Sequence, residues 1–150
     1  MSDSQLNAQQ LAEACSASMH SRDFAAQALG IKVCEVSPGY AKLSMTVRKD
    51  MLNGHNMCHG GFIFTLSDTA FAHACNSYNK VTVASGCTID FTAPGFEGDV
   101  LTAEAKERAR KGRTGIYDIT VTNQKGEELA LFRGKSHQIQ GTVLSEADQE

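Results

Sequence analysis

Residues 53–68 read Asn-Gly-His-Asn-Met-Cys-His-Gly-Gly-Phe-Ile-Phe-Thr-Leu-Ser-Asp, and this stretch decides the fold. At the pair Gly60-Gly61 the small and polar residues give way to a strongly apolar run that reaches Cys75. The apolar residues of this run fall all round a helical wheel, and a helix that is apolar on every side is a buried one. The sequence therefore predicts a buried central helix, which we expect to extend to about Tyr78.

Two features of this helix carry chemical groups suited to catalysis. The first N–H groups of a helix lack partners within it and lie at the positive end of its dipole, and glycine lets a ligand approach them closely. Gly60 and Gly61 therefore offer donors to an oxygen that gains negative charge. Asp68 adds a carboxylate in apolar surroundings, where it is rare unless paired or functional. Both features suit acyl transfer or hydrolysis, although a core helix with a hydrogen-bonded Asp would have the same sequence.

Length and composition are those of one globular domain over residues 1–150. The net charge of −3 argues against a nucleic-acid partner. No apolar run approaches about 18 residues, and the first residues lack the basic and apolar segments of a signal peptide. The five cysteines are odd in number and irregularly spaced, as in proteins with reduced thiols. We therefore expect a cytoplasmic protein with no membrane and no nucleic-acid partner.

The rest of the chain predicts further helices and a sheet. Before the central helix we expect an amphipathic helix over residues 5–20, a short helix over 24–29 capped by Asp23 and ended by Gly30, and strands over 31–37 and 40–47. After it, alternation of apolar and polar residues predicts strands over 81–91, 100–110, 114–122 and 128–139. In the first of these, Val83, Ser85, Cys87, Ile89 and Phe91 are predicted to share one face. Residues 140–150 are polar, and we expect them to fray.

This order of elements predicts an α+β fold. A sheet of this size must cover one of its faces, and a single strongly apolar helix is a suitable cover. We therefore expect the strands to curl around the central helix. The apolar far side of that helix indicates a second sheet or a partner subunit.

Several blocks of sequence resemble a known family. Asn53, His59-Gly60-Gly61 and Asp68 follow one another in that order, and the blocks at 51–55, 66–72, 88–91 and 130–137 accompany them. Together they resemble the hot-dog-fold thioesterases, and most closely the acyl-CoA thioesterases of bacterial phenylacetate degradation. The resemblance covers about residues 24–140. It implies a curved antiparallel sheet around a long central helix, and hydrolysis of phenylacetyl-CoA or its ring-hydroxylated forms without a cofactor.

The resemblance also implies roles for single residues. The amide of Gly60, with help from Gly61, would hold the developing oxyanion. Asp68 would act as general base on water, or as a nucleophile that forms a mixed anhydride. Asn53 would orient the water or the thioester, unless it is only a turn residue of an Asn-Gly pair. His59 would hydrogen-bond near the sulfur, or only shape the glycine turn.

The candidates for substrate binding come from the central helix, one strand and a hairpin. Lys111-Gly112-Arg113 is predicted to form a tight hairpin turn. In the family this hairpin tip often meets the phosphates or pantetheine of coenzyme A, and Arg and Lys suit phosphate groups. A charged hairpin tip is also an ordinary solvated turn. Phe64, Phe71 and Cys75 share a helix face with Asp68, as core residues or as the lining of an acyl pocket. The set assigned to substrate or coenzyme A is Gly61, Phe64, Phe71, Ser85, Lys111, Gly112, Arg113 and Thr114.

Other functions are less well supported by the sequence. His55, Cys58 and His59 have the spacing of zinc ligands, but no second pair of ligands follows, so no metal site is predicted. A hot-dog-fold dehydratase would need a His base paired with an acid, whereas the helix position is Asp68 and the nearby His lies outside the helix. A non-catalytic acyl-CoA-binding protein would need a second domain to receive its signal.

Helix geometry predicts a site shared between two chains. Gly60 and Asp68 are eight residues apart, which corresponds to about 12 Å along one helix axis. The backward lean of side chains recovers roughly 2–3 Å of this separation. A carbonyl bound at Gly60 is then too far from Asp68 of the same chain. Two antiparallel central helices related by a two-fold axis would bring Gly60 of one chain to Asp68 of the other. The homodimers and homotetramers of the family fit this arrangement, so we expect a homodimer and a dimer of dimers.

Overall fold

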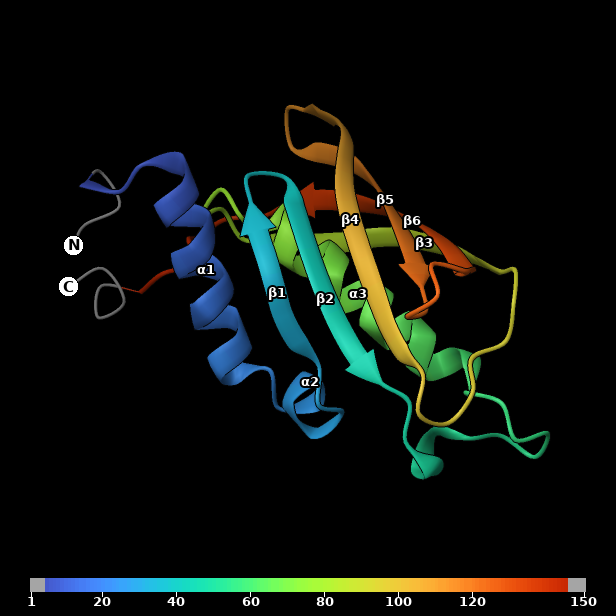
Figure 1. Ribbon diagram of the computed structural model, residues 1–150. Coiled ribbons are helices and arrows are strands. Elements are labelled where there is room, and N and C mark those ends of the chain that lie inside the picture. The colour runs from blue at the N-terminus through green and yellow to red at the C-terminus, as the bar shows by residue number, and fades with distance from the viewer. Residues whose placement is uncertain (1–4, 146–150) are drawn as a thin grey trace.

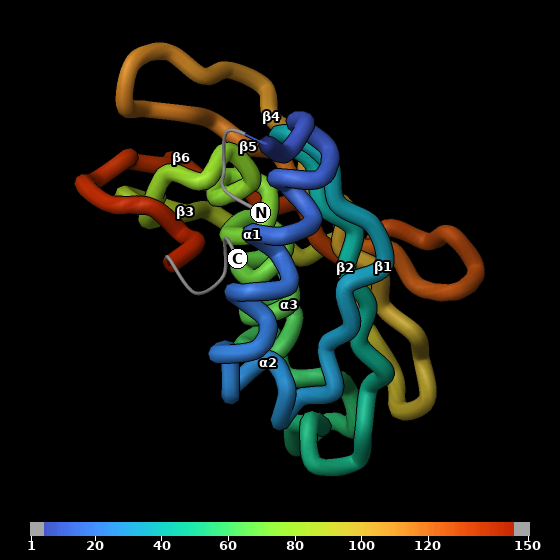
Figure 2. The backbone as a smooth tube through the Cα atoms, turned by 90° about the vertical axis from the view of Figure 1, so that its left-hand side faces the viewer, coloured from blue at the N-terminus to red at the C-terminus, as the bar shows by residue number. Residues whose placement is uncertain are grey.

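The computed structural model describes residues 5–145. Their strands form one curved antiparallel sheet that wraps around a long helix (Figure 1). The elements are α1 (Ala8–Arg22), α2 (Phe24–Ala28), β1 (Lys32–Ser37), β2 (Tyr40–Thr46), the 3-10 helix η2 (Lys49–Met51), α3 (Gly60–Cys75), β3 (Thr82–Phe91), β4 (Val100–Lys111), β5 (Thr114–Thr122) and β6 (Glu128–Gln138). The six strands have the order β1-β2-β4-β5-β6-β3. The predicted α+β arrangement is confirmed, because α3 lies in the hollow of the sheet in both views (Figures 1 and 2).

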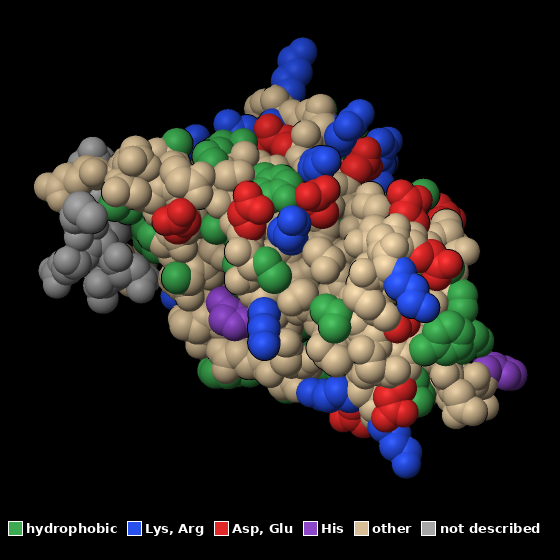
Figure 3. All heavy atoms as spheres, in the orientation of Figure 1, with side chains coloured by type: hydrophobic (Ala, Val, Ile, Leu, Met, Phe, Trp, Pro, Cys, Tyr) green, Lys and Arg blue, Asp and Glu red, His purple; other side chains and the backbone are tan. Residues whose placement is uncertain are grey.

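The inner face of the sheet follows the predicted alternation. Leu43 and Met45 of β2 are buried, as are Leu101 of β4 and Ile119 of β5. Their sequence neighbours point to the other face, which carries Lys, Arg, Asp and Glu side chains interspersed over β2 and β4 (Figure 3). Burial of the apolar face against α3 removes it from water, and this burial is the main favourable contribution to folding.

The first two helices begin at polar caps. Asn7 forms a capping box with Gln10, so α1 begins at Ala8, later than predicted. The carboxylate of Asp23 accepts a hydrogen bond from the N–H of Ala26 at 3.0 Å, and the predicted cap of α2 is confirmed.

The central helix α3 begins at the predicted glycine pair but ends at Cys75, three residues before the predicted end at Tyr78. Asn76 explains the earlier end. Its side chain donates to the carbonyl of Ala72 at 2.9 Å, and its Oδ1 accepts from the N–H of Thr82 at 2.9 Å. These bonds turn the chain from the helix into β3.

The expectation that α3 is buried on all sides is wrong for the single chain. The side that faces the sheet is buried and includes Ile63, Leu66, Ala70, Phe71 and Ala74. The opposite side is exposed or half-buried, at helical spacing, through Gly61, Thr65, Asp68 and Ala72. A helical wheel reports how apolar each side of a helix is, and not whether anything covers that side.

The predicted face of β3 is also wrong in part. Ala84 pairs with Ser136 and Gly86 pairs with Lys135, so Ser85 between them is an unpaired bulge residue. A bulge shifts the alternation by one residue. Val83 therefore lies on the opposite face from Cys87, and it is 43% exposed. Because β3 is at the edge of the sheet, its other backbone edge has no strand partner within residues 5–145.

The expected fraying of the chain after residue 140 is wrong for residues 141–145. Val143 and Leu144 are buried and pack against Cys15 of α1. The N–H of Leu144 also donates to Oδ1 of Asn79 at 2.8 Å. Residues 146–150 lie outside the described part of the chain. No helix within residues 5–145 is long and apolar enough to cross a membrane.

Candidate active site

The start of α3 presents two backbone donors. Among residues 5–145, the N–H groups of Gly60 and Gly61 have no hydrogen-bond acceptor. His59 is the N-cap residue, but its side chain makes no capping bond. The segment before the helix is held by the N–H of Cys58, which donates to the carbonyl of Gly95 at 2.7 Å. The donors are therefore fixed by the backbone and remain available to a ligand oxygen.

A cleft of about 590 Å³ opens at Gly60, the first of these donors. Its lining is Asn53, Met57, Cys58, His59, Gly60, Ile63, Phe91 and residues 92–95. The three residues predicted to surround the thioester carbonyl, Asn53, His59 and Gly60, thus line one cleft. The sequence did not indicate Phe91, whose ring lies over Gly60. A Cβ atom built on Gly60 would lie only 2.9 Å from Cζ of Phe91, so the close approach requires glycine.

Asn53 holds the loop that precedes the cleft. Its Oδ1 accepts hydrogen bonds from the N–H of His55 at 2.9 Å and of Met57 at 3.1 Å. This arrangement is the turn role that the Asn-Gly pair predicts. The amide Nδ2 makes no hydrogen bond within residues 5–145, so one end of the side chain is left for a ligand.

Asp68 lies half-buried on the uncovered side of α3. It makes no hydrogen bond or ion pair with any residue of the described range 5–145. Burial raises the pKa of this carboxyl group, and the charge of nearby Asp23 raises it further. A raised pKa makes the carboxylate a stronger base, as a catalytic carboxylate requires.

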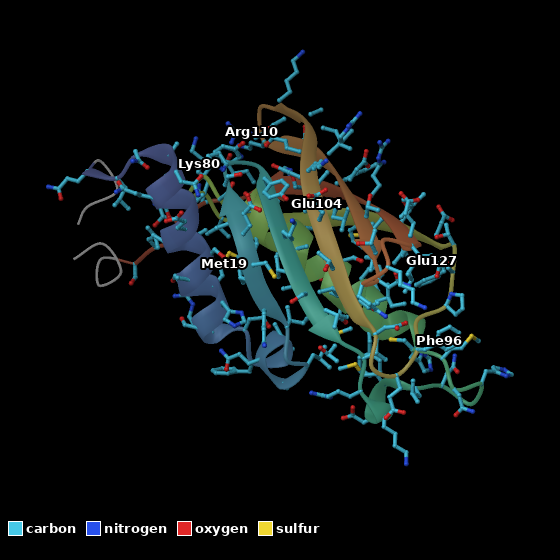
Figure 4. The ribbon with its side chains drawn as sticks, viewed as in Figure 1. Met19, Lys80, Phe96, Glu104, Arg110 and Glu127 are labelled. Atoms are coloured by element: carbon cyan, nitrogen blue, oxygen red, sulfur yellow. The ribbon has the colours of Figure 1, made fainter. Side chains whose placement is uncertain are left out.

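The single chain does not bring all the predicted site residues together. Asp68 is absent from the lining of the cleft at Gly60. The predicted coenzyme A hairpin, at residues 111–114, lies at the opposite end of the molecule from that cleft (Figure 1). In Figure 4, Arg110 and Lys80 mark the hairpin end, whereas Phe96 marks the end near the cleft. The donors and the hairpin therefore lie at opposite ends of one protomer.

The hairpin tip carries exposed cations on an ordered turn. Gly112 has a positive φ of 61°, and the carbonyl of Arg113 accepts from the N–H of Gln138 at 2.7 Å. The hydroxyl of Thr114 donates to the carbonyl of Lys111 at 3.1 Å. The predicted tight turn is confirmed, and its Lys and Arg side chains are exposed, where an anionic ligand can reach them.

Two further cations that the sequence analysis did not single out, Lys80 and Arg110, lie beside this tip. The guanidinium of Arg110 stacks on the ring of Tyr78, with Cζ 3.5 Å from the ring centroid. Only the position of Arg110, next to the predicted turn, could have indicated it from the sequence.

The predicted pocket residues have different surroundings. Phe71 is 1% exposed, and its ring fills the space over Gly134. Phe64 is half-buried and contacts Phe132 edge to face, with ring centroids 5.2 Å apart. The hydroxyl of Ser85 donates to the carbonyl of Lys135 at 3.2 Å. Their roles in substrate binding stay predictions.

The central helix α3 contains a histidine, His73, to which the sequence analysis gave no role. His73 belongs to α3, so the expectation that the only nearby His lies outside the helix is wrong. His73 is 2% exposed, its Nδ1 is 2.7 Å from the hydroxyl of Ser16, and burial lowers its pKa to about 4. It is therefore a buried neutral residue between α1 and α3. Within residues 5–145 no group of three His, Cys, Asp or Glu side chains is placed to hold a metal ion.

Comparison with known proteins agrees with this architecture. The family model of the Thioesterase superfamily matches residues 55–130. The acyl-coenzyme A thioesterase PaaI of Escherichia coli (strain K12) is 54% identical over 129 residues, which cover 86% of this chain and 92% of that protein. The structure of the E. coli PaaI protein from the phenylacetic acid degradation operon has a TM-score of 0.89 at 51% identity, and covers 91% of this chain and 99% of that chain.

A more distant structure, smu.793 from Streptococcus mutans UA159 bound to acetyl CoA, has a TM-score of 0.71 at 26% identity, and covers 75% of this chain and 90% of that chain. The resemblance inferred from the sequence motifs is thereby confirmed. The chain belongs to the thioesterase superfamily and is an acyl-CoA thioesterase of the hot-dog fold.

Proposed function

We propose that the protein hydrolyses phenylacetyl-CoA or ring-hydroxylated phenylacetyl-CoA to the free acid and coenzyme A, in phenylacetate catabolism. The observation that carries the mechanism is the N–H group of Gly60, which has no acceptor within residues 5–145 and lies at a cleft lined by Asn53 and His59. The aryl-acetyl substrate class is supported by the 54% identity to the E. coli acyl-coenzyme A thioesterase and by the operon of that relative.

The first step places the thioester carbonyl oxygen on the N–H of Gly60. As a nucleophile adds to the carbonyl carbon, the oxygen becomes an oxyanion at the positive end of the helix dipole. These donors are fixed before the reaction starts, so no reorganisation is needed when the charge forms. The unbonded Nδ2 of Asn53 can donate to the water or the thioester in the same cleft.

The second step uses the carboxylate of Asp68. As a general base, it removes a proton from water while the water oxygen bonds to the carbonyl carbon. The C–S bond then breaks, and the coenzyme A thiolate leaves and takes up a proton. As a nucleophile, Asp68 would itself bond to the carbonyl carbon and release the thiolate, and water would then hydrolyse the mixed anhydride. The raised pKa and the absence of a partner within residues 5–145 suit either role.

The reacting groups are supplied by two chains. The separation of Gly60 and Asp68 along α3, about 12 Å, is too long for one bound carbonyl. Within residues 5–145 nothing covers the side of α3 that contains Asp68, and one edge of β3 has no strand partner, so a second copy has a surface to cover. An antiparallel pair of α3 helices would form two equivalent sites in a homodimer, and two such dimers would form a tetramer.

Because the donors and the hairpin lie at opposite ends of one protomer, coenzyme A would extend from the donors of one chain to the hairpin tip of the second chain of the dimer. Lys111 and Arg113 are exposed there, and Lys80 and Arg110 lie beside them. The Streptococcus mutans relative binds acetyl CoA, which supports a ligand of this class. Phosphate groups pair well with Arg and Lys at a partly exposed site.

The test is an assay that traps the released thiol. We expect Asp68→Asn to fold and to lose roughly a hundredfold or more in kcat, because the near-isosteric amide cannot act as a base. Asp23→Asn is the matched control: it changes the neighbouring carboxylate, keeps a good helix cap and should retain activity at a pH above the acidic limb of the profile. Unchanged turnover in Asp68→Asn would contradict the mechanism.

The same assay tests the substrate class. We expect kcat/KM to be higher for phenylacetyl-CoA and its hydroxylated forms than for palmitoyl-CoA. A clear preference for palmitoyl-CoA would contradict the assignment to phenylacetate catabolism while leaving the thioesterase mechanism intact.

A further inference from the structure

Two loops of the protein share one backbone geometry. In the loop before α3, Oδ1 of Asn53 accepts from the N–H groups of residues 55 and 57, and its own N–H donates to the carbonyl of Met57 at 2.8 Å. In the loop between β5 and β6, Oδ1 of Asn123 accepts from the N–H groups of residues 125 and 127, each at 3.0 Å, and its N–H donates to the carbonyl of Glu127 at 3.0 Å.

The fourth residue of each loop confirms the match. Asn56 has a φ of 60° and Gly126 has a φ of 79°, so both occupy the left-handed region. Each of them also donates its N–H to the carbonyl of the first Asn, at 3.1 Å and 3.0 Å. The two loops are therefore the same turn formed by different sequences.

The two loops differ most in their second residue, which is Gly54 after Asn53 and Gln124 after Asn123. Gln124 is held by its side chain, which accepts from the N–H of Val100 at 3.0 Å and donates to Asp99 at 2.9 Å. Gly54 is exposed, and nothing lies within 4 Å of the position of a Cβ atom. Glycine has the widest backbone freedom of any residue. The nitrogen of Gly54 is therefore far less restrained than the nitrogen of Gln124.

We propose that Asn53 is a site of spontaneous deamidation, through a cyclic imide formed with Gly54. The backbone nitrogen of Gly54 bonds to Cγ of Asn53, the bond from Cγ to Nδ2 breaks, and ammonia leaves with the proton of the Gly54 amide. Water then opens the imide and leaves either aspartate or isoaspartate at position 53. Amide and water are thus converted to a carboxylic acid and ammonia, with no oxidant or other reagent.

The contacts of the Asn53 side chain favour this reaction. During the attack, negative charge develops on Oδ1, which faces the N–H groups of His55 and Met57. Donors placed where charge develops lower the barrier, as in an enzymatic oxyanion site. The leaving group Nδ2 makes no hydrogen bond within the described range, so no protein contact retains it.

The modification has a consequence for catalysis that rests on the proposed function. Asn53 lines the cleft at Gly60, where the thioester oxygen gains negative charge. Aspartate at position 53 places a second negative charge there, which disfavours the oxyanion. Isoaspartate adds a methylene group to the backbone of the loop that leads to His59 and Gly60. Both products lower activity, so the enzyme loses activity with age.

The test incubates the purified protein at mildly alkaline pH and follows each asparagine by peptide mass spectrometry. Deamidation adds about 1 Da. We expect Asn53 to be modified first, while Asn123 in the same turn stays intact. Gly54→Ala fits the open space and should slow modification about tenfold, because a Cβ atom restricts the backbone. Gln124→Gly should make Asn123 labile. Modification of Asn53 no faster than that of Asn123, or at an unchanged rate in Gly54→Ala, would overturn the proposal.

Activity measured on the same samples separates this proposal from the proposed function. We expect activity to fall in proportion to modified Asn53, and Asn53→Asp to have low activity from the start. Modification of Asn53 without loss of activity would support the modification site and contradict a role of Asn53 in catalysis. A stable Asn53 together with an inactive Asn53→Asp would support the catalytic role and contradict the modification site.

Discussion

The ring of Phe91, at the end of β3, lies directly over Gly60, the first residue of α3. A Cβ atom on Gly60 would lie 2.9 Å from Cζ of this ring. The donor site and the cleft beside it are therefore formed together by the start of a helix and the end of a strand.

This contact predicts that Gly60→Ala displaces the Phe91 ring into the cleft. We expect kcat/KM to fall roughly tenfold, because the thioester loses its position on the donors. In the background of Phe91→Ala the added methyl group has room, so the same change should have a smaller effect. A double-mutant cycle measures this difference. Equal losses in the two backgrounds would contradict the steric explanation.

The negative charge of Asp23 should affect the pH dependence of the reaction through the pKa of Asp68. The base form of Asp68 is needed, so activity falls as pH drops through the pKa of that group, which burial and then Asp23 raise. Removing the neighbouring charge with Asp23→Asn lowers this pKa. The acidic limb of the profile of kcat/KM against pH should therefore move to lower pH. A limb that stays in place would show that Asp23 does not act on the catalytic base.

Because His73 is buried, the protein should lose stability in mild acid. Burial and the nearby His20 lower its pKa to about 4, whereas in the unfolded chain it is about 6.5. Between these values the unfolded chain binds a proton that the folded protein does not. The contribution of neutral His73 is thus complete above about pH 6.5 and is lost as pH falls to about 4, by roughly 3 kcal/mol.

Urea unfolding at a series of pH values checks this sign and size. In His73→Gln the pH dependence over this range should flatten, whatever the effect on stability at neutral pH. His55→Gln alters an exposed histidine and should keep the wild-type slope. An unchanged slope in His73→Gln would assign the acid sensitivity to other groups.

The core leaves no room for a side chain at Gly134. A Cβ atom there would lie 2.7 Å from the ring of Phe71, which is itself buried. Gly134→Ala should therefore lower the free energy of unfolding by about 1–3 kcal/mol through overpacking. Gly54→Ala, at an open position, is the control for adding a methyl group. Equal stability of the two variants would contradict the tight packing of α3 on β6.

Much of the fold was predictable because period-two alternation reports burial directly. Leu101, Ala103 and Ala105 alternate with polar residues, and all three are fully buried in β4. The bulge at Ser85 was not predictable, because it depends on which residues of β6 pair with β3 and its own sequence is unremarkable for a strand.

The candidate site was predictable only where it is local in sequence. The glycine pair and Asp68 stand out because donors and a carboxylate within an apolar helix are unusual. Phe91 reaches Gly60 from another element, so no local pattern could reveal it. The uncovered stripe through Thr65 and Asp68 was likewise hidden, since an apolar wheel is the same whether the chain itself or a second copy covers it.

The central claim is that each active site combines Gly60 of one chain with Asp68 of its partner, and subunit mixing tests it most directly. Gly60→Pro removes the N–H at the first position of the helix, where the helix backbone accepts proline although the ring must displace Phe91, and Asp68→Asn removes the base. Each variant alone should be inactive. After subunit exchange, a mixed dimer regains one intact site, so activity should return toward about a quarter of the wild-type value on random pairing. If both variants fold and exchange subunits but activity does not return, the site lies within one chain, which contradicts the shared site.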